Sequence, residues 1–130
     1  LLDNSADVLL ETGISENTLR TVRRGMELVG TIGYCKNAFK DLPVKAAAKT
    51  GTSQVDRKIN GVTVTTNNGF LITYAPADNP QVIAIAIINK PQRTYYGGQI
   101  AAPVVRQLFE NILPYLGIMD YNRLDKVSET

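Results

Sequence analysis

The chain has 130 residues, 44% of them hydrophobic, and its 14 basic and 12 acidic side chains give a net charge of +2. This length suits one ordinary domain with a buried core. The charge is too small and too scattered to predict binding to nucleic acid or to an anionic membrane. The longest apolar run, 82–88, is far shorter than the roughly 20 residues that span a bilayer, so we expect a soluble protein. Cys35 is the only cysteine and the chain has no histidine, which excludes an internal disulfide and favours a buried, unreactive thiol.

The N-terminal part of the sequence predicts two helical segments. Residues 1–12 resemble the end of a helix that closes at Gly13, so we expect the chain to begin within a domain. Ser15 is a favourable N-cap, and the spacing after it predicts an amphipathic helix over 15–29 that ends at Gly30. Its apolar face carries Leu19, Val22, Met26 and Val29. The opposite, charged face is expected to be solvated and carries Arg20, Arg23, Arg24 and Glu27.

Turn and strand signals dominate residues 44–89 and predict an antiparallel sheet. After an irregular stretch, 30–43, small and β-compatible residues predict a first strand over 44–55. Asn60-Gly61 is the strongest hairpin signal in the chain, because both residues tolerate the positive φ of a tight primed turn. Asn67-Asn68-Gly69 repeats such a signal. The predicted strands after the first hairpin cover residues 62–66, 69–76 and 81–89.

The C-terminal part predicts a loop, a helix and a polar segment. Tyr96-Gly97-Gly98-Gln99 forms the loop, and glycines before a helix indicate a plain connection rather than the tip of a catalytic loop. A helix is predicted over 99–113, with Pro103 tolerated in its first turn and Pro114 ending it, and this helix must cover the sheet. Residues 119–130 are polar and aperiodic, which predicts a mobile tail or a linker. The apolar face of the helix carries Ile100, Val104, Leu108 and Ile112.

One motif with chemical content lies on the predicted first strand. Lys49-Thr50-Gly51-Thr52 contains the K-T-G sequence that, with S-x-x-K and S-x-N, builds the active site of penicillin-binding proteins and related β-lactamases. The nucleophilic serine must stand three positions before a lysine, and no lysine of this chain has one there. The lack of histidine excludes a Ser-His-Asp triad. Ser15-Glu16-Asn17 fits S-x-N formally but opens an amphipathic helix, so we interpret Ser15 as an N-cap. A nucleotide-binding P-loop is excluded because glycine here follows the lysine.

Several strings occur in an order that resembles the second half of the transpeptidase domain of class B, monofunctional penicillin-binding proteins. The resemblance covers about residues 5–118. It implies an α+β fold, a partial form of the β-lactamase/transpeptidase fold, in which residues 1–118 are the C-terminal portion of the domain and 119–130 a tail or linker. The family's first two strands and its nucleophile-bearing lobe would precede Leu1. The strings are Arg23-Arg24-Gly25-Met26 with Val29, Leu42-Pro43-Val44 before Lys49, Tyr74-Ala75-Pro76-Ala77, and Gly97-Gly98-Gln99 with Ala101-Ala102-Pro103.

The resemblance also implies a reaction. In the family, a serine attacks the D-Ala-D-Ala end of a peptidoglycan stem peptide, forms an acyl-enzyme and passes the acyl group to an amine; β-lactams mimic that peptide. By resemblance, Lys49 places a positive charge beside the second serine and the substrate carboxylate, and the backbone N–H of Thr52 is one of two oxyanion donors. The hydroxyls of Thr50 and Thr52 bind the carboxylate, and Gly51 keeps the approach open. No metal and no cofactor are implied, and the nucleophile is not in this chain.

We therefore expect the chain to be inactive alone and its parent to bind penicillin and catalyse peptidoglycan D,D-transpeptidation. The resemblance implies a parent at the extracytoplasmic face of the bacterial cell membrane, held by an N-terminal anchor outside this chain and working in a cell-wall synthesis complex. An open sheet edge predicts self-association of the isolated chain. Two alternatives remain open from the sequence: a non-enzymatic β-lactam sensor, and an interaction module of the same fold.

Overall fold

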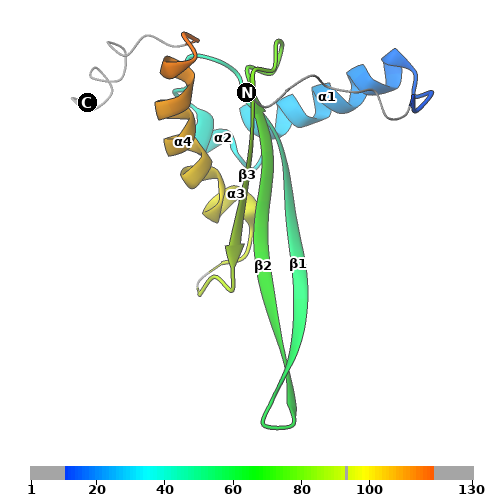
Figure 1. Cartoon of the computed structure of the whole chain (residues 1–130), viewed down its shortest axis with the longest axis vertical. Coiled ribbons are helices and arrows are strands. Elements are labelled where there is room, and N and C mark those ends of the chain that lie inside the picture. The colour runs from blue at the N-terminus through cyan, green and yellow to red at the C-terminus, as the bar shows by residue number, and fades with distance from the viewer. Residues whose placement is uncertain (1–10, 93, 119–130) are drawn as a thin grey trace, which may run out of the picture.

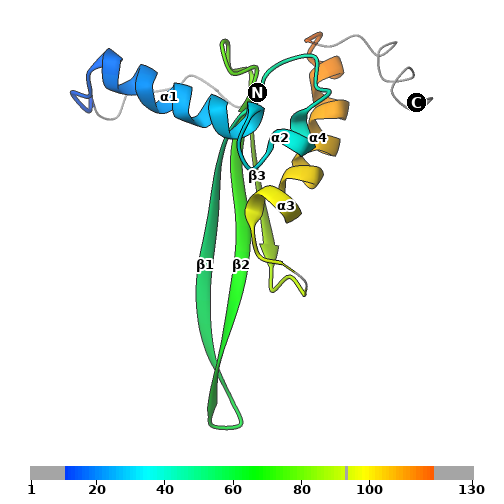
Figure 2. The ribbon, with the colours of Figure 1, turned by 180° about the vertical axis from the view of Figure 1, so that it is seen from behind.

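The computed structural model describes residues 11–92 and 94–118, which fold into one antiparallel sheet with helices around it, an α+β arrangement (Figure 1). The strand order is β1-β2-β3. Residues 1–10 of the expected first helix and the expected tail at 119–130 lie outside the described residues, and residues 11–13, where that helix was expected to end, are not helical. In chain order the elements are α1 (Glu16–Thr31), α2 (Lys36–Phe39), β1 (Ala47–Ile59), β2 (Val62–Ala75), β3 (Val82–Asn89), α3 (Gly97–Ile100) and α4 (Ala102–Tyr115). Helices α1 and α4 lie on opposite sides of the same end of the sheet, in the front view and from behind (Figure 1 and Figure 2).

Helix α1 begins where the sequence predicted and ends slightly later. The Ser15 hydroxyl accepts a hydrogen bond from the Thr18 N–H at 3.2 Å, which confirms Ser15 as the N-cap. The helix continues through Gly30 to Thr31, so Gly30 is not its terminator. Gly30 is buried, and a Cβ there would lie 1.9 Å from the carbonyl oxygen of Ala46. Glycine is needed because the helix backbone passes directly against the chain that enters β1.

The charged face of α1 is not wholly solvated. The Glu27 carboxylate pairs with Arg24 at 2.9 Å and, across the fold, accepts a hydrogen bond from Lys45 Nζ at 3.1 Å. Hydrogen bonding to Arg24, and then to Lys45, lowers the pKa of Glu27. The predicted apolar face is only partly covered in the described part of the chain, since the Val22 side chain is 56% exposed. The ion pair with Lys45 therefore helps to hold α1 beside the start of β1.

Strands β1 and β2 form one continuous ladder, from the pair Ala47–Tyr74 to the pair Ile59–Val62. Asn60 and Gly61 have φ values of 51° and 80°, which confirms the predicted hairpin. The second turn signal was wrong, because Asn67-Asn68-Gly69 lies inside β2 and pairs with residues 52–54. Extended pairing on both sides outweighs the local turn preference of Asn and Gly here, since Asn68 and Gly69 also pair with β3. The predicted strands 62–66 and 69–76 are therefore a single strand.

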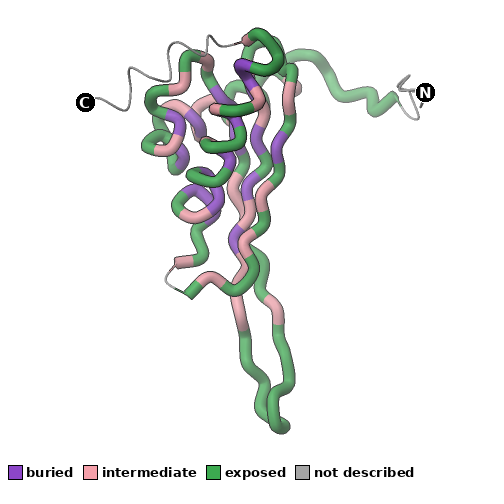
Figure 3. Tube along the Cα trace, turned by 60° about the vertical axis from the view of Figure 1, so that its left-hand side comes forward, coloured by how far each residue is buried: buried purple, intermediate pink, exposed green. Residues whose placement is uncertain are grey.

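The sheet is three-stranded for only part of its length. Strand β3 pairs with residues 68–75 of β2, so residues 54–67 form a two-stranded hairpin that projects beyond the body; we call it the arm. Most residues of the arm are exposed, in contrast to the body (Figure 3). The apolar residues exposed on one face of the arm include Ile59, Val62 and Val64.

Helix α4 buries a different face from the predicted one. Val104 and Leu108 of the predicted face are 49% and 41% exposed, so that assignment was wrong. The helix is apolar on two adjacent sides, and the side that carries the large Phe109 faces the core. The centroid of the Phe109 ring lies 6.1 Å from the centroid of the Phe39 ring in α2. Pro114 lies within the last turn, and the helix ends one residue later. The fully buried residues of the true face are Ala102, Val105, Phe109 and Leu113.

The thiol of Cys35 belongs to the core cluster and has no exposed surface, which confirms the expectation of a buried thiol. Burial raises the pKa of the Cys35 thiol from 9.0 to about 11.

We expect Cys35 in the native chain to react with a thiol reagent at pH 8 about 100-fold more slowly than in urea, because only the thiolate reacts and two pKa units separate the two states. Stability from this thiol is full below pH 9 and falls as the pH rises towards 11, because the unfolded state loses its proton first. Labelling with a chromogenic disulfide, with and without urea, measures the ratio. Equal rates would contradict the burial.

Candidate functional site: an open strand edge beside a pocket

The K-T-G motif lies on β1, as predicted. The sheet order places β1 at an edge, with only β2 beside it among the described residues. Lys49 pairs with Ile72 and Thr52 pairs with Gly69, both within the stretch where β2 also pairs with β3. The motif therefore sits in the three-stranded body, with one side of its backbone open to an added strand.

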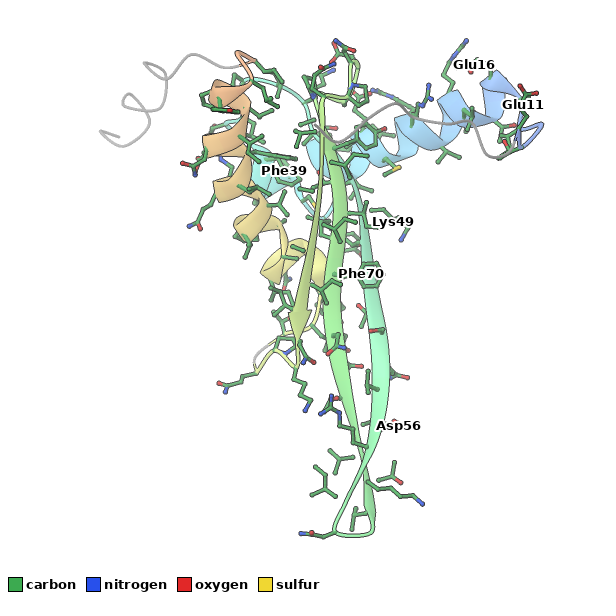
Figure 4. All side chains as sticks on the ribbon, viewed as in Figure 1. Glu11, Glu16, Phe39, Lys49, Asp56 and Phe70 are labelled. Atoms are coloured by element: carbon green, nitrogen blue, oxygen red, sulfur yellow. The ribbon has the colours of Figure 1, made fainter. Side chains whose placement is uncertain are left out.

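The side chain of Lys49 points away from the sheet at its outer edge (Figure 4). It is exposed, and its Nζ donates a hydrogen bond to the carbonyl oxygen of Thr50 at 2.6 Å. Thr50 is half-buried and Thr52 is exposed. Because side chains alternate along a strand, Lys49 and Gly51 share one face while Thr50 and Thr52 share the other. The motif thus presents a cation and two hydroxyls around one accessible backbone edge.

The structure shows a packing reason for glycine at Gly51, beside the role that the resemblance implies. A Cβ on Gly51 would lie 1.9 Å from Cζ of Phe70, its cross-strand partner on β2. The Phe70 ring therefore occupies the space that a side chain at Gly51 would need. Any larger residue would have to displace that ring, which is visible beside the motif in Figure 4.

A pocket of about 520 Å³ opens beside the motif and is lined by all four of its residues. The sequence predicted a loop at 96–99 but did not predict that this loop and Tyr34 line the pocket together with the motif. That loop does more than connect two elements, because its residues line the same pocket as the motif. The lining residues are Tyr34, Lys49, Thr50, Gly51, Thr52, Phe70, Tyr96, Gly97, Gly98 and Gln99.

Close backbone contacts fix the loop against β2. A Cβ on Gly97 would lie 2.1 Å from the carbonyl oxygen of Phe70, and one on Gly69 would lie 2.5 Å from the carbonyl oxygen of Tyr95. Gly97 and Gly98 are buried. Glycine at these positions therefore lets the loop and the start of α3 lie directly on the sheet, where they form a wall of the pocket.

The arrangement suits recognition of an anionic, extended ligand. Lys49 supplies positive charge, the hydroxyls of Thr50 and Thr52 supply hydrogen-bond donors, and an edge strand supplies backbone N–H groups. The Ser15 hydroxyl bonds to Thr18 at the N-terminus of α1, which confirms it as a cap rather than a member of this site.

Comparison of the sequence with models of known protein families identifies the family of this chain. The model described as the penicillin binding protein transpeptidase domain matches residues 4–110. The chain belongs to this family. The penicillin-binding resemblance drawn from the K-T-G strand and its flanking strings is thereby confirmed.

Curated relatives agree with this assignment. The chain is 34% identical over 108 residues to Stage V sporulation protein D of Bacillus subtilis, covering 81% of this chain and 16% of that protein. It is 33% identical over 113 residues to peptidoglycan D,D-transpeptidase FtsI of Buchnera aphidicola subsp. Baizongia pistaciae, covering 82% and 19%. It is 35% identical over 107 residues to the probable peptidoglycan D,D-transpeptidase PenA of Neisseria flavescens, covering 81% and 26%. The chain thus spans about a quarter or less of the length of these relatives.

Solved structures show the same fold. The Pseudomonas aeruginosa PBP2 structure in complex with WCK 5153 matches with a TM-score of 0.63 at 24% identity, covering 87% of this chain and 23% of that one. The apo transpeptidase domain of Burkholderia pseudomallei penicillin-binding protein 3 also matches with a TM-score of 0.63 at 24% identity, covering 81% and 32%. Within residues 11–92 and 94–118, no helix is long and apolar enough to cross a membrane.

Proposed function

We propose that residues 1–118 are the C-terminal portion of a penicillin-binding transpeptidase domain, followed by a tail or linker at 119–130, and that the parent protein catalyses peptidoglycan D,D-transpeptidation and binds β-lactams. The observation that carries this proposal is the K-T-G motif on an open strand edge, lining a pocket. The names of the relatives point to the same reaction.

In this proposal the chain supplies substrate-binding groups, and the nucleophilic serine comes from the rest of the domain. The substrate carboxylate accepts hydrogen bonds from the hydroxyls of Thr50 and Thr52, beside the charge of Lys49. The N–H of Thr52 donates to the oxyanion of the tetrahedral intermediate. Gly51 keeps the strand free of a side chain where the peptide passes. No step of this chemistry requires a metal or a cofactor.

Labelling with a fluorescent penicillin tests the proposal. The full-length parent should become covalently labelled, and Lys49→Ala should lower the labelling rate by about 100-fold or more, because the carboxylate loses its charged partner. This 130-residue chain alone should not be labelled, because it lacks S-x-x-K. An unlabelled parent would refute the proposed function, and a labelled isolated chain would refute the assignment of the nucleophile.

We further propose that the parent is anchored at the extracytoplasmic face of the cell membrane by an N-terminal segment outside this chain and works within a cell-wall synthesis complex. Stem peptides of peptidoglycan are extracytoplasmic substrates, which supports this location. Protease treatment of intact spheroplasts should remove the transpeptidase domain while it leaves cytoplasmic proteins intact.

The isolated chain is proposed to self-associate. In β3, Ile83, Ile85 and Ile87 are 69%, 64% and 67% exposed, on the face of the sheet opposite to α4. Ile85 lies beside Ile72 of β2, which in turn pairs with Lys49, so this apolar face adjoins the motif. An apolar row of this kind beside an open strand edge favours association between copies.

We expect sedimentation velocity to show dimers or larger species of the isolated chain at micromolar concentration, and Ile85→Lys to shift the distribution towards monomer. The substitution places a charge in the apolar row without touching the core, because Ile85 is mostly exposed. Thr63→Lys, on the polar face of the arm, is the matched control and should leave the distribution unchanged. A wild-type chain that stays monomeric would contradict the proposal.

A further inference from the structure

The arm has one strand edge that carries charged side chains and one that carries none. The β1 half of the arm contains Asp56, Arg57 and Lys58, and all three are exposed. Residues 62–66 of β2, Val-Thr-Val-Thr-Thr, include no charged residue, no proline and no glycine. Charged residues and proline are what natural proteins place on exposed edges to prevent pairing with another strand, whereas β-branched residues favour pairing. The β1 edge of the arm is therefore protected, and the β2 edge at 62–66 is not.

The unprotected edge at 62–66 continues the line of β3. Strand β3 pairs with β2 as far as Asn89, opposite Asn68. The chain then turns away at Lys90, which has a φ of 49° and donates its N–H to Oδ1 of Asn68 at 3.0 Å. Among the described residues, no strand pairs with that side of β2 beyond this point, and Figure 1 shows the hairpin extending past the end of β3. Since alternate residues of an antiparallel strand direct both N–H and C=O to the same side, 62–66 offers backbone donors and acceptors where β3 would have continued.

The side chains beside this edge indicate the chemistry of a strand that could be added. Ile59, Val62 and Val64 lie on one face of the arm, because Ile59 pairs with Val62 and Val64 is two residues further along β2. Their exposed fractions are 54%, 64% and 38%. Apolar, β-branched side chains of an added strand would extend this row on one face, and its alternate side chains would lie beside threonines on the other. The edge thus suits an uncharged segment in which apolar and small polar residues alternate.

The length of the edge fits a single added strand rather than a second copy of the chain. Five extended residues cover about 17 Å. A standard protein–protein interface takes roughly 20–30 residues from each partner, which is far more than this edge provides. Strand addition needs less, because main-chain hydrogen bonds supply the affinity and alternate side chains supply the specificity. A third strand would also stabilise the arm, because an isolated two-stranded hairpin is marginally stable in water.

We propose that the edge of β2 at 62–66 binds an extended segment of a partner protein by strand addition. The bound segment runs antiparallel to β2 in the line of β3, and it is uncharged over about five residues, with β-branched residues at alternate positions. This interaction goes beyond the proposed function, because it requires neither the K-T-G motif nor a nucleophile.

Hydrogen–deuterium exchange of the full-length parent tests the proposal with a synthetic peptide as the probe. The peptide contains Thr-Val-Thr-Val-Thr joined to a charged solubility tag, and the control peptide has the same sequence with every amide of the pairing segment N-methylated. A saturating amount of the first peptide should slow exchange of the outward amides of 62–66 about 10-fold or more. The outer amides of β1 at 54–59 should keep their rate, because no strand is added there. The N-methylated peptide should change neither segment.

Paired substitutions in the parent then measure the contribution of each edge, by fluorescence anisotropy of the labelled peptide. Val62→Lys with Val64→Lys places two charges on the unprotected edge and should weaken binding about 10-fold. The matched control, Val55→Lys with Ile59→Lys, places the same two charges on the same face of the arm but on β1. It should change the affinity less than about threefold, because these side chains do not lie directly beside the added strand. Circular dichroism checks that both variants are folded.

Several outcomes would refute the proposal. The first is that the peptide leaves exchange at 62–66 unchanged, or slows the outer edge of β1 equally. Slow exchange at 62–66 without peptide would mean that the edge is already covered, by the parent itself if the protection persists on dilution and by a second copy if it disappears. A parent that binds the peptide at this edge but is not acylated by penicillin would refute the proposed function and leave this inference standing.

Discussion

Thr52→Pro in the full-length parent is expected to lower the rate of penicillin acylation about 10²- to 10³-fold, or about 2.7–4 kcal/mol of transition-state stabilisation. Proline removes the backbone N–H that the proposal assigns to the oxyanion. It is tolerated in an edge strand when that N–H faces away from the sheet, and β1 is an edge strand among the described residues. Stopped-flow acylation with a chromogenic β-lactam measures the effect.

The control for this experiment is Thr52→Ala, which keeps the N–H but, like proline, lacks the hydroxyl. We expect its acylation rate to fall only about 10-fold, because one neutral hydrogen bond is lost, so the further loss in Thr52→Pro reports the N–H. Near-wild-type acylation by Thr52→Pro would mean that the donor lies elsewhere. Circular dichroism of each variant should match the wild type, because a folded protein is needed for the comparison.

Gly30→Ala is expected to destabilise the chain by about 3 kcal/mol, the upper end for overpacking. The added Cβ would lie 1.9 Å from the carbonyl oxygen and 2.9 Å from the carbonyl carbon of Ala46. Both atoms belong to the backbone, so they cannot rotate away as a side chain would. Helix α1 would have to move from the start of β1, and with it the ion pair between Glu27 and Lys45. Urea unfolding followed by circular dichroism measures the loss.

The same helix offers a matched control in Gly25, where an added Cβ meets no atom within 4 Å. Gly25→Ala should stabilise the chain by about 1 kcal/mol, because alanine has the higher helix propensity and no contact opposes it. The two substitutions are chemically identical and lie on one helix, so opposite signs would isolate the contact with Ala46. Equal effects of both variants would contradict the packing described here.

Local signals predicted the elements that depend on local chemistry. Ser15 was identified as an N-cap and Asn60-Gly61 as a hairpin because the side chain or the φ preference of each residue decides the conformation. The signal at 67–69 failed because pairing with strands on both sides outweighed the same preference. The buried face of α4 was assigned wrongly because the helix has two apolar sides, and its packing against α2 and the sheet buries the side with Phe109.

The candidate site could be predicted only in part. The K-T-G motif is contiguous in sequence, so its residue types indicated its chemistry directly. The other residues that line the pocket are Tyr34 and residues 96–99. No local sequence pattern indicates that these segments lie beside the motif on β1. The one available signal was the pair of glycines at 97 and 98, which indicate close backbone approach as well as a loop. The contact of Phe70 with Gly51 depends on strand register, and the sequence analysis predicted no register because the turn signal at 67–69 divided β2.

The arm has a consequence for the site beside it. Three strands extend only as far as the pairs of Asn68 with Asn89 and of Ser53 with Asn68, one residue beyond Thr52. Past this point each strand has a single neighbour and little cover, so amide protons there should exchange with deuterium far faster than those of the body. The proposed oxyanion donor, the N–H of Thr52, thus lies one residue before the end of the three-stranded part of the sheet. Only Ser53 separates Thr52 from the arm, so motion of the arm is transmitted to the proposed donor. A molecule that bound the arm would reduce that motion at Thr52.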